Sequence, residues 1–102
     1  MRDVLERVVK DKAKKTLKNM GAYYFMPVTG GFGRSGVLDI CACLRGEFIG
    51  IECKADDITK MSVLQVAEFV KIREAGGRAF LINANNVDQL EELICGSTKK
   101  RL

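Results

Sequence analysis

The chain has 102 residues, 47% of them hydrophobic and 29% charged, which is enough for one folded domain over residues 1–102 and excludes two. Its net charge of +4, with a basic tail from about residue 96, fits a polyanionic partner such as nucleic acid. The absence of histidine excludes Ser-His-Asp and Cys-His catalysis, and the four cysteines form no CxxC pair, so a four-cysteine zinc site is only a minor alternative.

The first predicted element is a helix over residues 2–20. This segment lacks glycine and proline, and its apolar residues recur at helical spacing: Leu5, Val9, Ala13, Leu17 and Met20. Gly21 follows directly and predicts the end of the helix. Glu6 falls on the same apolar arc, where a carboxylate needs a partner or a function. An ion pair with Lys10, one turn later, is the simpler of these two explanations.

A short strand and a glycine-rich loop follow the helix. Residues 22–26 are rich in aromatic side chains and predict a strand that stops at Pro27. The loop GGFGRSG has the Gly-x-Gly-x-x-Gly spacing of a dinucleotide-binding fingerprint, but that motif requires a helix next, whereas residues 37–44 alternate as a strand does. We therefore expect no nucleotide cofactor. The loop can instead approach a nucleic-acid backbone, and its candidate contacts are Gly33, Arg34 and Ser35.

Residues 37–44 and 47–54 alternate between apolar and other side chains with a period of two, which predicts a β-hairpin. If Arg45-Gly46 form a two-residue turn, Asp39 lies opposite Glu52. One face of this hairpin is then almost wholly apolar, with Leu38, Ile40, Ala42 and Leu44 against Ile49, Ile51 and Cys53. A slip of one residue would bury the charged residues in the core, which supports this register.

The remaining elements are a helix, a strand and a last helix. A helix over residues 62–75 is predicted because Ser62 and Gln65 have the spacing of a capping box. Its apolar positions include Val63, Val66, Ala67, Val70 and Ile72. Residues 78–83 predict a buried strand, and residues 87–94 a helix whose N-cap is Asn85 or Asn86. Three consecutive strands, followed by a helix that leads to a fourth strand, predict an α/β domain with a mixed sheet.

The hairpin carries the residues best suited to catalysis. Asp39 and Glu52 repel one another when both are charged, and a divalent metal would remove that conflict. Hard oxygen ligands suit Mg²⁺ or Mn²⁺, and Lys54, two residues after Glu52, adds a cation on the same face. A metal and a cation are what phosphodiester hydrolysis needs. The alternative is a surface ladder of ion pairs in which Lys54 lies between the two carboxylates.

The segments that carry this chemistry resemble a known family. Gly36-Val-Leu-Asp39, Ile51-Glu52-Cys53-Lys54 and Ser62-Val-Leu-Gln65 occur in the order typical of the PD-(D/E)XK nuclease superfamily, and most closely of its VRR-Nuc branch, the virus-type replication and repair nucleases. The resemblance covers nearly the whole chain. It implies an α/β restriction-endonuclease-like fold, in which a central mixed sheet is flanked by helices in the order αβββαβα. Leu38 departs from the branch, which commonly has proline there, but this position brings no ligand.

The resemblance implies a role for each matching residue of the hairpin. Asp39 and Glu52 match the two metal-binding carboxylates, and the carbonyl oxygen of Cys53 matches a further ligand. Lys54 matches the catalytic lysine that positions or activates the attacking water. The implied cofactor is Mg²⁺ or Mn²⁺.

Two residues outside the hairpin also match the family's site. Gln65 matches a glutamine beside the catalytic residues, although its place in a capping box explains it equally well. Glu6 matches a first-helix glutamate that reaches the metal site, which would account for its position on the apolar arc of that helix.

The resemblance implies a metal-dependent, structure-selective endonuclease of branched DNA such as Holliday junctions, active in DNA repair. Small members of the branch resemble the archaeal junction resolvases, which implies a homodimer, and one small domain cannot cut both strands of a junction by itself. Val4 and Val8, opposite the main apolar stripe of the first helix, are candidate dimer contacts, with ordinary partial burial as the alternative. We expect no membrane partner and a cytoplasmic protein, in the host cytoplasm if the source is a phage or virus.

Two alternatives to this function stay open. A nuclease of the same chemistry would act on flaps, single strands or duplex DNA. A catalytically silent DNA-binding module would keep the fold without cleaving, but the intact set of Asp39, Glu52 and Lys54 argues against it.

Overall fold

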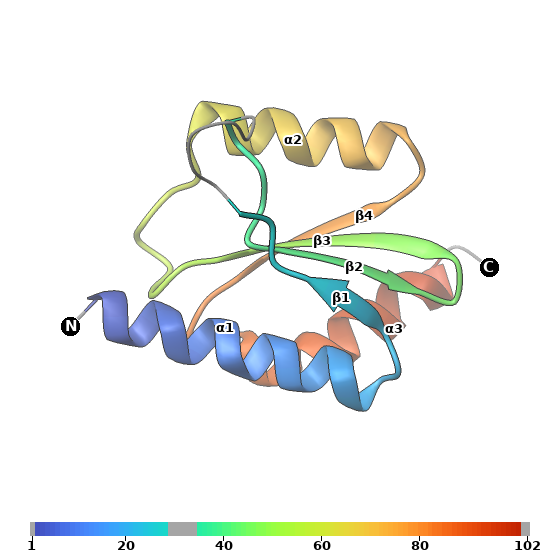
Figure 1. The fold of residues 1–102 in the computed structure, drawn as a ribbon, viewed down its shortest axis with the longest axis horizontal. Helices are drawn as coiled ribbons and strands as arrows, with labels where there is room; N and C mark the ends of the chain where they lie inside the picture. Colours follow the sequence, from blue (N-terminus) through green and yellow to red (C-terminus); the bar gives the residue numbers. More distant parts are fainter. Residues whose placement is uncertain (1, 29–34, 101–102) are drawn as a thin grey trace.

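The computed structural model describes residues 2–28 and 35–100, the last four of them as backbone only. Its elements are α1 (Arg2–Asn19), β1 (Tyr23–Phe25), β2 (Ile40–Leu44), β3 (Glu47–Cys53), α2 (Val63–Glu74), β4 (Arg78–Ile82), a 3-10 turn (Val87–Gln89) and α3 (Leu90–Lys100) (Figure 1). This is the predicted order αβββαβα. Within the described residues, no helix is long and apolar enough to cross a membrane.

The four strands form one mixed sheet in the order β1-β2-β3-β4. The first three are antiparallel, and β4 runs parallel to β3 because α2 makes the crossover between them. The predicted hairpin register is confirmed, since Leu44 pairs with Glu47 and Ile40 pairs with Ile51. Arg45 and Gly46 both have positive φ, 52° and 83°, as expected for the turn type that matches the twist of a hairpin.

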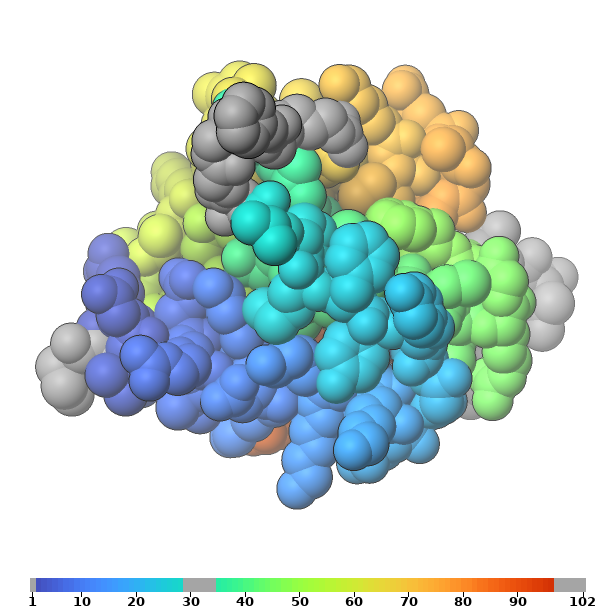
Figure 2. Space-filling model, viewed as in Figure 1, coloured from blue at the N-terminus to red at the C-terminus, as the bar shows by residue number. Residues whose placement is uncertain are grey.

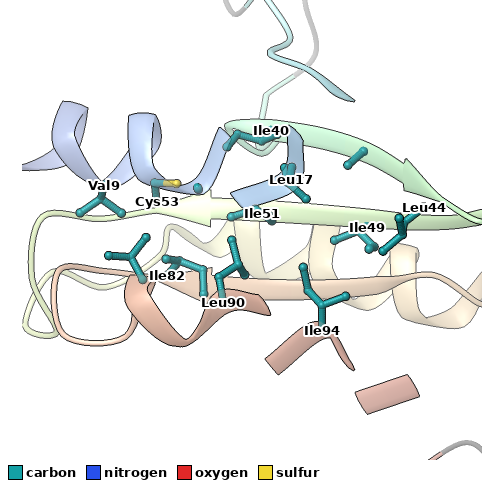
Figure 3. Packing of buried hydrophobic residues seen from close by; sticks show 13 residues of the cluster. Val9, Leu17, Ile40, Leu44, Ile49, Ile51, Cys53, Ile82, Leu90 and Ile94 are labelled. Atoms are coloured by element: carbon teal, nitrogen blue, oxygen red, sulfur yellow. The ribbon is translucent and has the colours of Figure 1, made fainter. Parts of the chain in front are cut away.

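Helices α1 and α3 cover one face of the sheet, and α2 covers the other (Figure 1). The main core lies under α1 and α3 and is aliphatic (Figure 3). It is formed by Val9, Ala13, Leu17, Ile40, Ala42, Leu44, Ile49, Ile51, Cys53, Ile82, Val87, Leu90 and Ile94. The segment around β1, an edge strand, lies at the surface between α1 and α2 (Figure 2).

Leu38 belongs to a second, smaller core, and its predicted position is wrong. The hairpin pattern placed it on one face with Ile40, whereas Ile40 belongs to the main core and Leu38 packs with Phe69 and Ala79 on the α2 face. The reason is that β2 begins only at Ile40, so the alternation of side chains along a strand does not extend back to Leu38.

The buried face of α2 does not coincide with its apolar positions. Its buried residues are Glu68 and Phe69, and Ile72 packs against the same small core. Four of the apolar positions named from the sequence are exposed: Val63, Val66, Ala67 and Val70. With apolar residues around most of its circumference, the helix has no sequence signal strong enough to fix which side meets the sheet.

The helix ends follow the expected chemistry at two places and depart from it at a third. Gly21 ends α1 with a φ of 83°, and the Ser62 hydroxyl and the Gln65 side chain form the predicted capping box of α2. The last helix starts differently, because Asn86 makes no side-chain cap and its Oδ1 accepts the Asn83 backbone N–H instead. The backbone of α3 continues to Lys100, so the expected basic tail starts within that helix.

Candidate functional site

Asp39 and Glu52 lie side by side at the end of the hairpin remote from its turn. The backbone N–H of Asp39 donates to Glu52 Oε1 at 3.3 Å, and Asp39 Oδ2 accepts the backbone N–H of Cys53 at 2.8 Å. Each carboxylate is therefore held by the backbone of the neighbouring segment. The pairing of Asp39 with Glu52 expected from the register is confirmed, and it places the two carboxylates close enough for the charge of one to affect the pKa of the other.

Glu52 is 3% exposed, and its described side-chain contacts are with Asp39, Lys54 and Gln65. These four residues are called the catalytic cluster below. Its Oε2 accepts a hydrogen bond from Gln65 Nε2 at 2.8 Å and lies 3.2 Å from Lys54 Nζ. Burial of the carboxyl group, and next the charge of Asp39, raise the pKa of Glu52 to about 7 despite the nearby lysine. The folded protein therefore stabilises a proton, or another cation, at Glu52.

Gln65 links the start of α2 to this cluster. Its Oε1 accepts the backbone N–H of Ser62 at 3.0 Å and a hydrogen bond from Lys54 Nζ at 3.3 Å, while its Nε2 donates to Glu52. The capping role and the place beside the site, stated as alternatives for this residue, are both observed. The side chain fixes the relative positions of Glu52 and Lys54.

Glu6 reaches the cluster through Lys10. The predicted ion pair is confirmed, with Lys10 Nζ 3.2 Å from Glu6 Oε2, and the same ammonium lies 3.6 Å from Asp39 Oδ1. Burial alone would lower the pKa of Lys10, but the carboxylates of Asp39 and Glu6 outweigh it and raise that pKa. Sequence reasoning missed the contact of Lys10 with Asp39, because it requires α1 to lie across the end of β2.

Cys53 contributes its backbone here, since its side chain belongs to the main core (Figure 3). Burial, and then the charges of Asp39 and Glu52, raise the pKa of the thiol to about 12, so the thiol stays protonated at neutral pH. All four cysteines are free, and the described residues contain no group of three His, Cys, Asp or Glu suited to a metal ion. The four-cysteine zinc alternative is therefore wrong.

The donor set nevertheless fits a hard divalent cation. Mg²⁺ is commonly held by one or two carboxylates, with water and substrate phosphate in its other positions, so Asp39 and Glu52 suffice. Both oxygens of Asp39 and both of Glu52 now face cations or N–H donors, which marks them as acceptors for positive charge. Asp39 and Glu52 are oxygen ligands of the kind that Mg²⁺ or Mn²⁺ takes, whereas the described residues offer no set of ligands for a structural zinc.

The glycine-rich loop is only partly described. Gly33 and Arg34 lie outside the described residues, and Ser35 is exposed. Gly36 has a φ of 83°, and a Cβ there would lie 2.6 Å from the Leu64 carbonyl oxygen, so glycine is required where the chain passes the start of α2. The chain then leads into β2 and not into a helix, which excludes the dinucleotide-binding arrangement.

A mixed sheet with this helix order, and with Asp39, Glu52 and Lys54 at one end of two central strands, defines a PD-(D/E)XK-like α/β protein. A solved structure described as a "VRR_NUC domain" superposes with a TM-score of 0.75 at 30% sequence identity, over 86% of this chain and 95% of that chain. The chain belongs to the VRR_NUC family, a family of nuclease domains. No family model and no curated protein matches it.

Proposed function

We propose that the protein is a metal-dependent nuclease that hydrolyses phosphodiester bonds in DNA. The observation that carries the proposal is the pairing of Asp39 with Glu52. The Asp39 backbone N–H donates to Glu52 Oε1, the Cys53 N–H donates to Asp39 Oδ2, and Lys54 Nζ lies 3.2 Å from Glu52. A buried carboxylate whose pKa is raised beside a second carboxylate is typical of functional sites, and a bound divalent cation would relieve the repulsion between the two groups. Membership of a nuclease-domain family supports the same conclusion.

Each residue then has a distinct task. Asp39 and Glu52, with the carbonyl oxygen of Cys53, would hold Mg²⁺ or Mn²⁺, which supplies Lewis acidity toward the phosphate when bound. Lys54 positions the attacking water and stabilises negative charge that develops on the phosphate. Gln65 holds the Lys54 ammonium and the Glu52 carboxylate in fixed relative positions. Glu6 acts indirectly, because it pairs with Lys10, which in turn contacts Asp39.

The substrate proposed is branched DNA such as a Holliday junction. The net charge of +4 favours binding to a phosphate backbone, and we assign Gly33, Arg34 and Ser35 to that contact. A nuclease that acts on flaps, single strands or duplex DNA has the same catalytic residues. A binding module that does not cut is the candidate from a different class.

We also propose that the working form is a homodimer, because one catalytic cluster cannot cut two strands of a junction in a fixed relation. Val4 and Val8 are 55% and 44% exposed and stay candidate contacts. A second candidate surface is the flank of α2 that carries Val63, Val66 and Val70, spaced at three and four residues and exposed. Light scattering decides between a monomer and a dimer, and Val66→Glu and Val4→Glu distinguish the two surfaces.

The decisive experiment incubates the protein with four-way junction, flap, single-stranded and duplex DNA in Mg²⁺, Mn²⁺ or EDTA. Asp39→Asn and Lys54→Ala are compared with two exposed matched controls, Asp88→Asn and Lys15→Ala. We expect EDTA and both site variants to abolish cleavage and the controls to cleave as wild type does. Cleavage that persists in Asp39→Asn or in EDTA contradicts the mechanism, and binding without any cleavage favours the silent module.

A further inference from the structure

Lys10 joins two carboxylates that come from different parts of the fold. Its ammonium lies 3.2 Å from Glu6 on the same helix and 3.6 Å from Asp39, the residue before β2, and its side chain is 27% exposed. An ordinary i,i+4 pair on a helix surface needs no third partner. The additional contact places a positive charge at the carboxylate to which the proposed function assigns the metal.

We propose that Lys10 is the internal counter-ion of the metal site: it stabilises Asp39 while no metal is bound and competes with a divalent cation for the same oxygen. The proposal rests on the metal-dependent function argued above. It assigns Lys10 a role in metal affinity that differs from the role of Lys54 in the reaction.

The contacts of Asp39 show why the competition is direct. Asp39 Oδ2 accepts the backbone N–H of Cys53 at 2.8 Å, and Lys10 contacts the other oxygen, Oδ1. Oδ1 is therefore the oxygen with the freer geometry for a metal, and Lys10 now lies against it. A cation that binds Oδ1 must displace the ammonium or bind beside its charge.

Lys10 is also the cation of the cluster that can move. Lys54 is held by Glu52 and by Gln65 Oε1, so its displacement would break two contacts at once. Lys10 can leave Asp39 and keep its ion pair with Glu6. Glu6 is therefore the partner that Lys10 retains when a metal binds Asp39. Because Lys10 competes with the metal, it also sets the metal concentration at which the site is occupied.

The experiment measures Mn²⁺ binding to the full chain without DNA, by the loss of the free-ion electron paramagnetic resonance signal. Lys10→Met removes the competing charge with little change in length, Lys10→Arg keeps the charge, and Lys14→Met is the matched control from a surface pair with Asp11 on the same helix. We expect Lys10→Met to bind Mn²⁺ about tenfold more tightly, since a unit charge about 4 Å away is worth roughly that factor or more at a protein surface. Lys10→Arg and Lys14→Met should bind as wild type does.

A second measurement separates this role from a structural one. Thermal unfolding in EDTA should show Lys10→Met less stable than wild type, because Asp39 and Glu6 lose their counter-ion, and saturating Mn²⁺ should raise its melting temperature by more than it raises that of wild type. An equal loss of stability with and without Mn²⁺, or an unchanged or weaker Mn²⁺ affinity in Lys10→Met, overturns the proposal.

Failure of the underlying metal site gives a different result. If Mn²⁺ binds wild type and Asp39→Asn abolishes this binding, the metal site stands, and a Lys10→Met protein that binds like wild type overturns only the role of Lys10. If neither wild type nor Asp39→Asn binds Mn²⁺, the proposed metal site fails, and the role of Lys10 fails with it.

Discussion

The two ends of β3 each carry a glutamate paired with a cation, but the two pairs differ in kind. At the turn end, Glu47 lies 2.7 Å from Arg78, whose guanidinium also donates to the Ile94 carbonyl oxygen of α3. At the other end, Glu52 pairs with Lys54 and accepts the backbone N–H of Asp39, whose carboxylate raises the pKa of Glu52. One carboxylate with one arginine ties neighbouring elements together. Two neighbouring carboxylates repel, which is the difference that the proposed metal site would explain.

The first prediction is that substitution of Glu52, but not of Glu47 at the other end of β3, lowers the cleavage activity. Glu52→Gln should lower cleavage at least about a hundredfold, because it removes a proposed metal ligand, while leaving stability in EDTA unchanged or higher. Glu47→Gln should cleave normally per folded molecule and lose about 2 kcal/mol of stability, because Arg78 keeps its charge without a carboxylate partner. Single-turnover cleavage and urea unfolding measure both. Equal activity in the two variants would remove the functional distinction between the ends.

The second prediction concerns pH in the absence of metal. Burial and the charge of Asp39 raise the pKa of Glu52 from its ordinary value of 4.5 to about 7, whereas Lys54 and Gln65 face the same carboxyl group as donors. Between these values the folded state binds a proton that the unfolded chain releases, so this group's contribution to stability is complete below about pH 4.5 and is lost as the pH rises through about 7.

The measurement is urea unfolding in EDTA across that interval. Wild type should lose about 2 kcal/mol relative to Glu52→Gln as the pH rises from about 4.5 to about 7, and Glu47→Gln should follow the wild-type curve. Parallel curves for wild type and Glu52→Gln would show that Glu52 has no raised pKa. Saturating Mg²⁺ should reduce the difference, because the metal replaces the proton.

The smallest predicted effect separates the two roles of Gln65. Ser62→Ala removes the cap alone and should lower stability by about 1 kcal/mol with cleavage unchanged. Gln65→Ala should lower stability by a similar amount and also reduce cleavage about tenfold, since Lys54 and Glu52 lose the side chain that positions both. Equal cleavage in Ser62→Ala and Gln65→Ala would leave Gln65 with a capping role only.

Local chemistry predicted much of the fold and of the site. The hairpin register followed from a two-residue turn and from the period of the strands, and that register is what places Asp39 opposite Glu52. The capping box fixed the start of α2 and so the position of Gln65. These features depend on residues close in the chain or paired across one turn.

The departures at Leu38 and in α2 concern packing between elements. Leu38 was assigned by an alternation that stops at the first residue of β2, and α2 has apolar residues on sides that do not meet the sheet. The contact between Lys10 and Asp39 joins residues 29 positions apart in the chain and depends on where α1 crosses the sheet. No local pattern encodes that crossing point.

The sequence by itself therefore determined the elements, the hairpin register and the pair of carboxylates with their lysine, because turns, caps and strand alternation act over a few residues. The tertiary structure alone decided which side of α2 is buried, that Gln65 bridges Glu52 and Lys54, and that Lys10 lies against Asp39. These contacts depend on how the helices pack against the sheet, because burial of apolar surface brings together side chains that are far apart in the chain.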